Sequence, residues 1–188
     1  MALLSKEDIL RGLHKLDAKA KAASMTVDLA IYGGAALAIC FDMRKATRDV
    51  DAVVRGDPSF LRKAAQEVAR EENWPLDWLN DGVKGWLSER EQMQLMSEFP
   101  GTDGGLRIFL PTPRYLFAMK CMAMRPEGID GSHDISDIRG LALAAGIRNS
   151  DEALELIASF YPQSRIPPKT VFGVQEILNG SSGGDSDS

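Results

Sequence analysis

The sequence predicts an α+β fold, in which a small mixed β-sheet carries helices on one face and a helical C-terminal part follows. Its 188 residues are 44% hydrophobic and 26% charged, the composition of an ordinary globular chain that can bury a core. Segments that resemble strands fall within residues 1–111, and helical spacing dominates after residue 112. We therefore expect a core over residues 1–111, helices packed on it over 112–179, and a disordered tail over 180–188.

The charge balance is acidic, with 22 Lys and Arg against 27 Asp and Glu and a formal net charge of −5. Such a chain has no overall attraction for the phosphates of nucleic acids, so any binding of that kind would need a local basic patch. The two cysteines show neither a disulfide framework nor zinc spacing. No signal peptide is recognisable, and the longest apolar run, 29–41, is too short to cross a bilayer. We expect a soluble cytoplasmic protein.

The expected helices are the segments in which apolar residues recur every three or four positions. In the first of them, Ile9, Leu13 and Leu16 form an apolar stripe and Ser5 stands at the capping position. Ser59 is placed to cap the third helix, directly after a Gly-Asp-Pro turn. The predicted helices cover residues 6–23, 35–41, 59–72, 134–145, 150–160 and 168–178, and a further helix starts at residue 113.

The expected strands are short apolar or alternating runs that are bounded by turn residues. They cover residues 29–32, 49–54, 76–79 and 106–110. Segment 83–100 fits no single pattern, and we interpret it as a helix followed by an irregular loop.

Two adjacent glycines, Gly33 and Gly34, separate the first strand from the second helix. Glycines let the backbone turn sharply and let an anion approach the N–H groups at the start of a helix. The alternative is that they only allow the helix and the strand to pack tightly. The segment lacks both the GxGxxG and the P-loop pattern, which excludes those two phosphate-binding fingerprints.

The second strand carries two aspartates, Asp49 and Asp51, on either side of Val50. Because side chains alternate along a strand, both carboxylates point to the same face. Two like charges this close repel each other unless a cation lies between them, and hard divalent ions prefer carboxylate oxygens. We therefore predict a Mg²⁺ site, which Mn²⁺ could also fill. Solvated acids at a strand end are the alternative interpretation.

A third carboxylate is expected one strand later. Asp77 would face the same side as the first two acids, where three carboxylates would hold two metal ions and one could accept a proton from an attacking hydroxyl. Asp81, just beyond this strand, is the competing candidate, and either could instead be a turn residue. Trp78 alternates with Asp77, so we expect it to point to the opposite face and to pack in the core or at its rim.

The order of these features resembles a known signature. Gly33-Gly34, a helix and then Thr47-Arg48-Asp49-Val50-Asp51 are similar to the pattern of the DNA polymerase β-type nucleotidyltransferase superfamily. More narrowly, they resemble the AbiEii-like bacterial nucleotidyltransferases, which include toxins of type IV toxin–antitoxin systems.

A second block resembles the same narrower group. It consists of an apolar helical segment over 116–123 that bears Lys120, then Arg125, and then Asp134 and Asp137 in a D-x-x-D pattern. Together with Asp77, the two blocks span residues 31–139.

The resemblance implies a nucleotidyltransferase core and Mg²⁺-dependent transfer of a nucleotide from an NTP to an acceptor hydroxyl. In that reaction Asp49 and Asp51 hold the metal ions, and Asp77 completes the second metal site or acts as the base. Gly33 and Gly34 contact the triphosphate through backbone N–H groups, since Gly34 stands where many members carry serine. The implied acceptor is an RNA, a tRNA in some relatives, or a protein, and a toxin role would add an antitoxin partner.

Three more residues are implied to contact the nucleotide, and each has an ordinary alternative role. Arg48 would contact phosphate, or it could pair with a nearby carboxylate. Lys120 would contact the triphosphate, or it could extend to solvent from its helix. Asp134 would be the acid of the second block, or it could cap the helix that follows.

Two other functions agree with the same residues. A member of this fold without activity would be a binding module for a partner protein, although a retained pair of like charges has little structural use. A metal-dependent glycosyltransferase would use the DxD pattern for a sugar nucleotide. Such enzymes need a larger sheet before the DxD pattern than the 48 residues that precede Asp49 can form.

Overall fold

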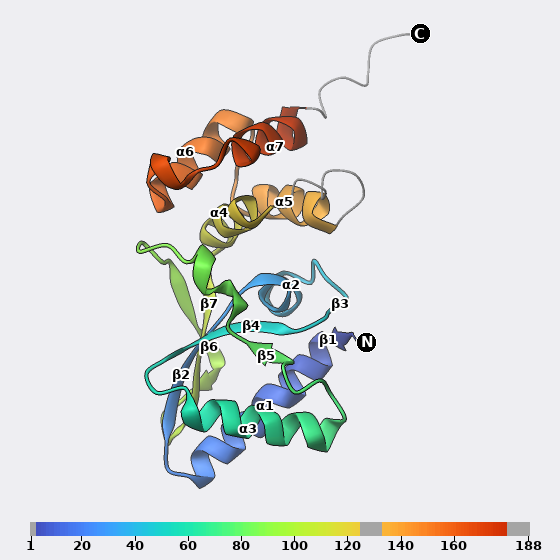
Figure 1. Cartoon of the computed structure of the whole chain (residues 1–188), viewed down its shortest axis with the longest axis vertical. Helices are drawn as coiled ribbons and strands as arrows, with labels where there is room; N and C mark the ends of the chain where they lie inside the picture. The colour runs from blue at the N-terminus through green and yellow to red at the C-terminus, as the bar shows by residue number, and fades with distance from the viewer. Residues whose placement is uncertain (1–2, 125–132, 180–188) are drawn as a thin grey trace. The chain divides into compact units, whose positions relative to one another are not determined.

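The computed structural model describes residues 3–124 and 133–179, which form two compact units (Figure 1). The first unit comprises Met1–Gly85 and Met93–Pro111, and the second comprises Trp86–Gln92 and Thr112–Ser188. Helices and strands are both abundant, which confirms the predicted α+β class. Segment 86–92, which we expected in the core, belongs to the second unit. The predicted tail over 180–188 lies outside the described residues.

The first unit contains a mixed sheet and the helices that pack on it. Its elements are β1 (Leu4–Ser5), α1 (Lys6–Ala22), β2 (Thr26–Ile31), α2 (Gly33–Phe41), β3 (Ala46–Thr47), β4 (Val50–Arg55), α3 (Ser59–Glu72), β5 (Leu79–Asn80), the 3₁₀ turn η1 (Gly82–Trp86), β6 (Met93–Pro100) and β7 (Gly105–Pro111).

The main sheet has five strands in the order β5-β4-β2-β7-β6 (Figure 1). The central strand β2 pairs antiparallel with β4 and parallel with β7. At one edge β5 lies parallel to β4, and at the other β6 lies antiparallel to β7. Strands β1 and β3 form a separate antiparallel pair. The sheet is therefore mixed, as predicted.

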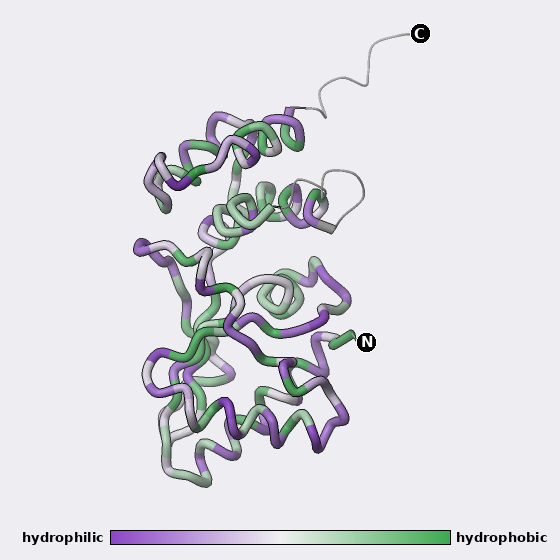
Figure 2. Tube along the Cα trace, in the orientation of Figure 1, coloured by the Kyte–Doolittle hydropathy of each residue, from purple (hydrophilic) through white to green (hydrophobic). Residues whose placement is uncertain are grey.

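One face of the main sheet is buried under helices. Leu29 in β2 and Val50 and Ala52 in β4 point to this face and are at most 5% exposed. Helices α1 and α3 contact each other and cover this face (Figure 1), and hydrophilic and hydrophobic residues alternate along α3, whose apolar side is buried (Figure 2). By the same alternation, Asp51 and Arg55 point to the opposite face of β4.

The caps of α1 and α3 differ. Ser5 caps α1 as predicted: its hydroxyl accepts from the Asp8 N–H at 3.2 Å, and the Asp8 carboxylate accepts from the Ser5 N–H at 2.9 Å. Ser59, by contrast, is the first residue of α3 rather than its cap. Its N–H and hydroxyl donate to the Asp57 carboxylate, so an aspartate two residues earlier satisfies the helix start.

The structure differs from the predictions in two segments. Segment 76–79 is mostly a turn, closed by the Trp78 N–H donating to the Pro75 carbonyl at 3.0 Å, and only Leu79–Asn80 joins the sheet. The turn places the Trp78 indole in the core, fully buried, where its N–H donates to the Ala65 carbonyl. Segment 83–100, expected as a helix and a loop, contains the 3₁₀ turn η1 and strand β6.

The second unit is helical. Its elements are α4 (Pro113–Ala123), α5 (His133–Ala144), α6 (Ser150–Phe160), the 3₁₀ turn η3 (Gln163–Arg165) and α7 (Pro168–Asn179). Thr112 caps α4 and Asn149 caps α6 through their side-chain oxygens. Segment 86–92 is held here because the Tyr161 hydroxyl donates to the Trp86 carbonyl and the Ser88 N–H donates to the Tyr115 hydroxyl. Within residues 3–124 and 133–179, no helix has the length and apolar character needed to cross a membrane.

Candidate functional site

The glycine turn and one of the two strand acids lie together in the first unit. Gly33 is the first residue of α2 and has a φ of +60°, a conformation that glycine adopts without strain. A Cβ on Gly33 would lie 2.7 Å from Oδ2 of Asp51, so the missing side chain leaves room for this carboxylate. A backbone hydrogen bond also connects the two segments, since the Tyr32 N–H donates to the Asp51 carbonyl at 2.8 Å. The start of α2 and the acid of β4 are therefore adjacent.

The second acid is connected to strand β5. The Asn80 side-chain amide donates to Oδ2 of Asp49 at 2.9 Å, and its carbonyl oxygen accepts from the Gly82 N–H at 2.9 Å. The parallel pairing of β4 and β5 sets Asn80 directly opposite Asp51. A Cβ on Gly82 would lie 3.0 Å from Oδ1 of Asn80 and 3.7 Å from Oδ1 of Asp51. Asp49, Asp51 and Asn80 thus form one cluster at this edge of the sheet.

The second glycine of the turn also faces polar groups. A Cβ on Gly34 would lie 2.7 Å from Oγ1 of Thr47 and 3.1 Å from a guanidinium nitrogen of Arg44. Position 34 can therefore hold no side chain unless these groups move. A hydroxyl and a cation stand beside the N-terminus of α2, whose cap residue, Tyr32, makes no side-chain hydrogen bond to the start of the helix. All three features favour a negatively charged ligand at this point.

The two candidates for a third carboxylate do not join the acid pair. Asp77 lies on the exposed turn before β5, and no hydrogen bond or ion pair connects it to the rest of the described chain. Asp81 is exposed and pairs with Lys84 at 2.5 Å. The hydrogen bond from Lys84 lowers the pKa of Asp81, which makes this carboxylate a weaker base. The residue that the sheet register brings beside Asp49 and Asp51 is Asn80, which the sequence patterns presented only as part of a turn.

Arg48 is exposed and makes no hydrogen bond or ion pair with the described residues. Among residues 3–124 and 133–179 it has no carboxylate partner, which was its alternative role. The basic side chain that contacts the glycine turn is Arg44, four residues earlier.

Lys120, Asp134 and Asp137, which belong to the second sequence block, form an ion-pair cluster in the second unit. Lys120 of α4 lies 2.7 Å from the Asp134 carboxylate and 3.0 Å from that of Asp137, both on α5. Lys120 is 17% exposed and Asp137 only 2%, so the ammonium group does not extend into solvent. Opposite charges at partly buried positions hold α4 and α5 together.

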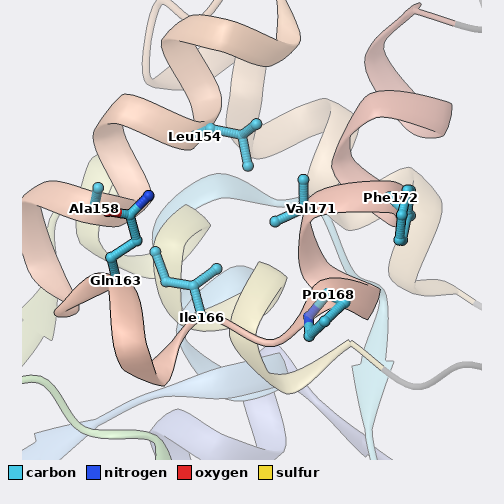
Figure 3. A pocket seen from close by; sticks show the side chains of 7 residues that line it. All are labelled: Leu154, Ala158, Gln163, Ile166, Pro168, Val171 and Phe172. Atoms are coloured by element: carbon cyan, nitrogen blue, oxygen red, sulfur yellow. The ribbon is translucent and has the colours of Figure 1, made fainter.

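Each unit contains a pocket. The pocket in the first unit has a volume of about 330 Å³ and extends from Asn80 and Asp81 to Leu61 and Ala65 of α3. The pocket in the second unit, of about 440 Å³, lies between α6 and α7 (Figure 3). Its lining contains no ionisable side chain, so it offers no group for acid–base or metal chemistry. Asn80 lines the pocket of the first unit, whereas Asp49 and Asp51 do not.

The donor set at the acid pair fits a divalent cation. Asp51 in β4 and Asp49, which directly precedes this strand, offer carboxylate oxygens close to Asn80, and Mg²⁺ prefers oxygen ligands of this kind. Their mutual repulsion is an unfavourable energy that a bound cation would offset. Within residues 3–124 and 133–179 there is no group of three or more His, Cys, Asp or Glu side chains arranged to hold a metal ion. A cation bound here would therefore have two carboxylates rather than three.

The chain matches no known protein family, no curated protein and no solved structure. The arguments about its function below therefore start from the geometry of the acid pair and the glycine turn.

Proposed function

We propose that this chain binds an NTP together with Mg²⁺ and transfers a nucleotide to an acceptor hydroxyl. The observation that supports this proposal is the contact between the Asp51 carboxylate and the Gly33 turn, with Asp49 hydrogen-bonded to Asn80, the residue opposite Asp51. This contact brings an acidic group and the positive end of a helix together. A cation–triphosphate complex needs both kinds of surface, because it is positive at the metal and negative at the phosphates.

The roles of the residues follow from their positions. Asp49 and Asp51 would hold Mg²⁺, which when bound supplies positive charge against the phosphoryl oxygens. The backbone N–H groups at the start of α2 and the Arg44 guanidinium would face the β- and γ-phosphates. With the NTP oriented in this way, the acceptor oxygen forms a bond to the α-phosphorus. The bond from the α-phosphorus to pyrophosphate breaks, and the hydroxyl proton passes to solvent.

The acceptor in this proposal is an RNA, such as a tRNA, or a protein, as the resemblance to the AbiEii-like group implies. A toxin role with an antitoxin partner belongs to the same proposal. The experiment is to incubate the full chain with each labelled NTP, Mg²⁺, total RNA and cell protein, and to identify what carries the label. Transfer to RNA and transfer to protein are separated by digestion with nuclease or protease.

The acid pair provides the matched test. Asp49→Asn and Asp51→Asn keep the side-chain shape but remove the charge, so each should lower transfer by about 100-fold or more and leave the fold intact. Asp103→Asn, which changes an exposed acid on the turn between β6 and β7, is the control and should behave like the wild type. Full activity in either acid-pair variant would rule out the proposal. Mg²⁺–NTP binding by calorimetry without any transfer would instead indicate a binding module.

A further inference from the structure

We infer that the pocket of the first unit is a binding site for a small organic carboxylate, a molecule that joins one carboxylate to an apolar body. The lining of this pocket comes mainly from α3, β4, β5 and η1. Its volume of about 330 Å³ is at the lower end of the range for ligand pockets, which indicates a compact ligand. Because Asp49 and Asp51 do not line it, this inference is independent of the proposed function.

The floor of the pocket is apolar. Leu29 and Ala52 of the sheet and Leu61 and Ala65 of α3 line it, and each is at most 5% exposed. Leu76, on the turn before β5, lines the pocket as well but is 55% exposed. An apolar ligand body would contact this floor and remove part of Leu76 from water, which is favourable.

Two polar side chains of α3 line the same pocket. Arg62 and Gln66 are four residues apart and therefore lie on one face of the helix. Among residues 3–124 and 133–179, neither side chain has a hydrogen-bond or ion-pair partner. A guanidinium only donates hydrogen bonds, and the amide of Gln66 can also donate, so a ligand group that accepts from both suits this position. A carboxylate has two acceptor oxygens and the charge opposite to that of Arg62.

The other charged groups at the pocket are already engaged. Lys84 and Asp81 both line it and form an ion pair at 2.5 Å. Lys84 is the main cause of the lowered pKa of Asp81, to which Arg62 contributes least. Asp57, just before α3, accepts hydrogen bonds from Ser59 on both carboxylate oxygens. The guanidinium of Arg62 therefore matches a single negative charge, and a phosphate monoester would bring up to about two.

The test is a titration of the full chain with 3-phenylpropanoate, followed through the ¹H–¹⁵N NMR signals of the protein. We expect saturable shifts at Gly56, Leu76 and Leu79, which line the pocket, with a Kd of about 1 mM for a ligand of this size. The amide 3-phenylpropanamide keeps the apolar body and loses the charge, so it should bind about 10-fold more weakly. Acetate, which has the charge without the body, and phenyl phosphate should both bind more weakly than the acid.

Three variants show which side chains hold the ligand. Arg62→Gln should remove the preference for the acid over its amide, because the charge that distinguishes them is gone. Arg70→Gln, at another exposed arginine of α3 that does not line the pocket, is the matched control and should bind as the wild type does. Leu76→Ser should weaken the acid and the amide alike, by about 3–10-fold, because both lose an apolar wall. Positions 62 and 76 are exposed, and circular dichroism shows that each variant folds.

Equal affinity for the acid and its amide would overturn the inference, and so would an Arg62→Gln variant that keeps the preference. The absence of saturable shifts in the first unit at about 10 mM acid would also overturn it. Shifts confined to Leu154 and Phe172 would place the ligand in the apolar pocket of the second unit instead (Figure 3). The titrations contain neither NTP nor Mg²⁺, so their failure leaves nucleotide transfer untouched, and failure of the transfer assay leaves carboxylate binding untouched.

Discussion

Gly33→Ala tests the contact on which the site depends. Gly33 has a φ of +60°, and an alanine in this left-handed conformation costs about 1–2 kcal/mol. Its Cβ would also lie 2.7 Å from Oδ2 of Asp51, which is closer than Cβ atoms approach their neighbours in folded proteins. Because the carboxylate stands at the end of a side chain, it can rotate away from the new methyl group. The clash therefore moves one of the two acids out of the site.

The expected result is a loss of about 1–2 kcal/mol in the free energy of unfolding together with a loss of Mn²⁺ binding comparable to that of Asp51→Asn. Urea denaturation followed by tryptophan fluorescence measures the free energy of unfolding, because Trp74 and Trp78 both lie in the first unit. Electron paramagnetic resonance of free Mn²⁺ measures the binding. Gly56→Ala is the matched control, since Gly56 lies in the first unit and has a positive φ, of +123°, but no atom within 4 Å of its Cβ position. It should lose stability and keep its Mn²⁺ affinity. If Gly33→Ala bound Mn²⁺ as tightly as the wild type, the adjacency of turn and acid would not define the site.

Two further predictions concern the stability of the first unit. The N–H of Ser5 donates to the Asp8 carboxylate and lowers the pKa of this group. The ionised carboxylate therefore stabilises the fold above about pH 4, and this stabilisation is lost as the pH falls through the lowered pKa of the folded state. Asp8→Asn should therefore reduce stability at pH 7 and flatten its dependence on pH below 4, as thermal melts over that range would show; an unchanged acid dependence would contradict it. Trp78→Phe removes a buried indole and leaves the Ala65 carbonyl without its donor, which should cost about 2–4 kcal/mol in urea denaturation. A cost below about 1 kcal/mol would mean that the indole is not packed in the core.

The parts of the fold that the sequence predicted well are those whose signals are local. Helix α1 carries both an apolar stripe and a capping serine, and the structure confirms its start at Lys6. Strand β6 has no comparable signal, because most of its residues are exposed and its pairing with β7 is interrupted by a shift in register between Leu95 and Pro100. An edge strand of this kind shows little alternation, so segment 83–100 could not be assigned from its pattern.

The candidate site likewise has residues that local patterns predict and one that depends on a long-range strand pairing. The face to which Asp51 points follows from strand alternation alone, and the glycine turn follows from two adjacent residues. Asn80 depends instead on the pairing of β5 with β4, which brings it to Asp49, 31 residues earlier in the sequence, and which no local pattern specifies. Asp77 was favoured because segment 76–79 resembles a strand. In the structure this segment is mostly a turn, which buries the Trp78 indole and leaves Asp77 exposed.

The central position of β2 has a consequence for the order in which this unit folds. Asp28 of β2 pairs with Arg55 in β4 and with Arg107 in β7, which lies 79 residues further along the chain. Closing the longer loop costs about 1 kcal/mol more in chain entropy than closing the shorter one. During synthesis β2, α2 and β4 emerge first, so the glycine turn and Asp51 can meet before β7 has left the ribosome. Until β7 arrives, one edge of β2 stays open, and this is the stage at which the nascent chain is most exposed to aggregation.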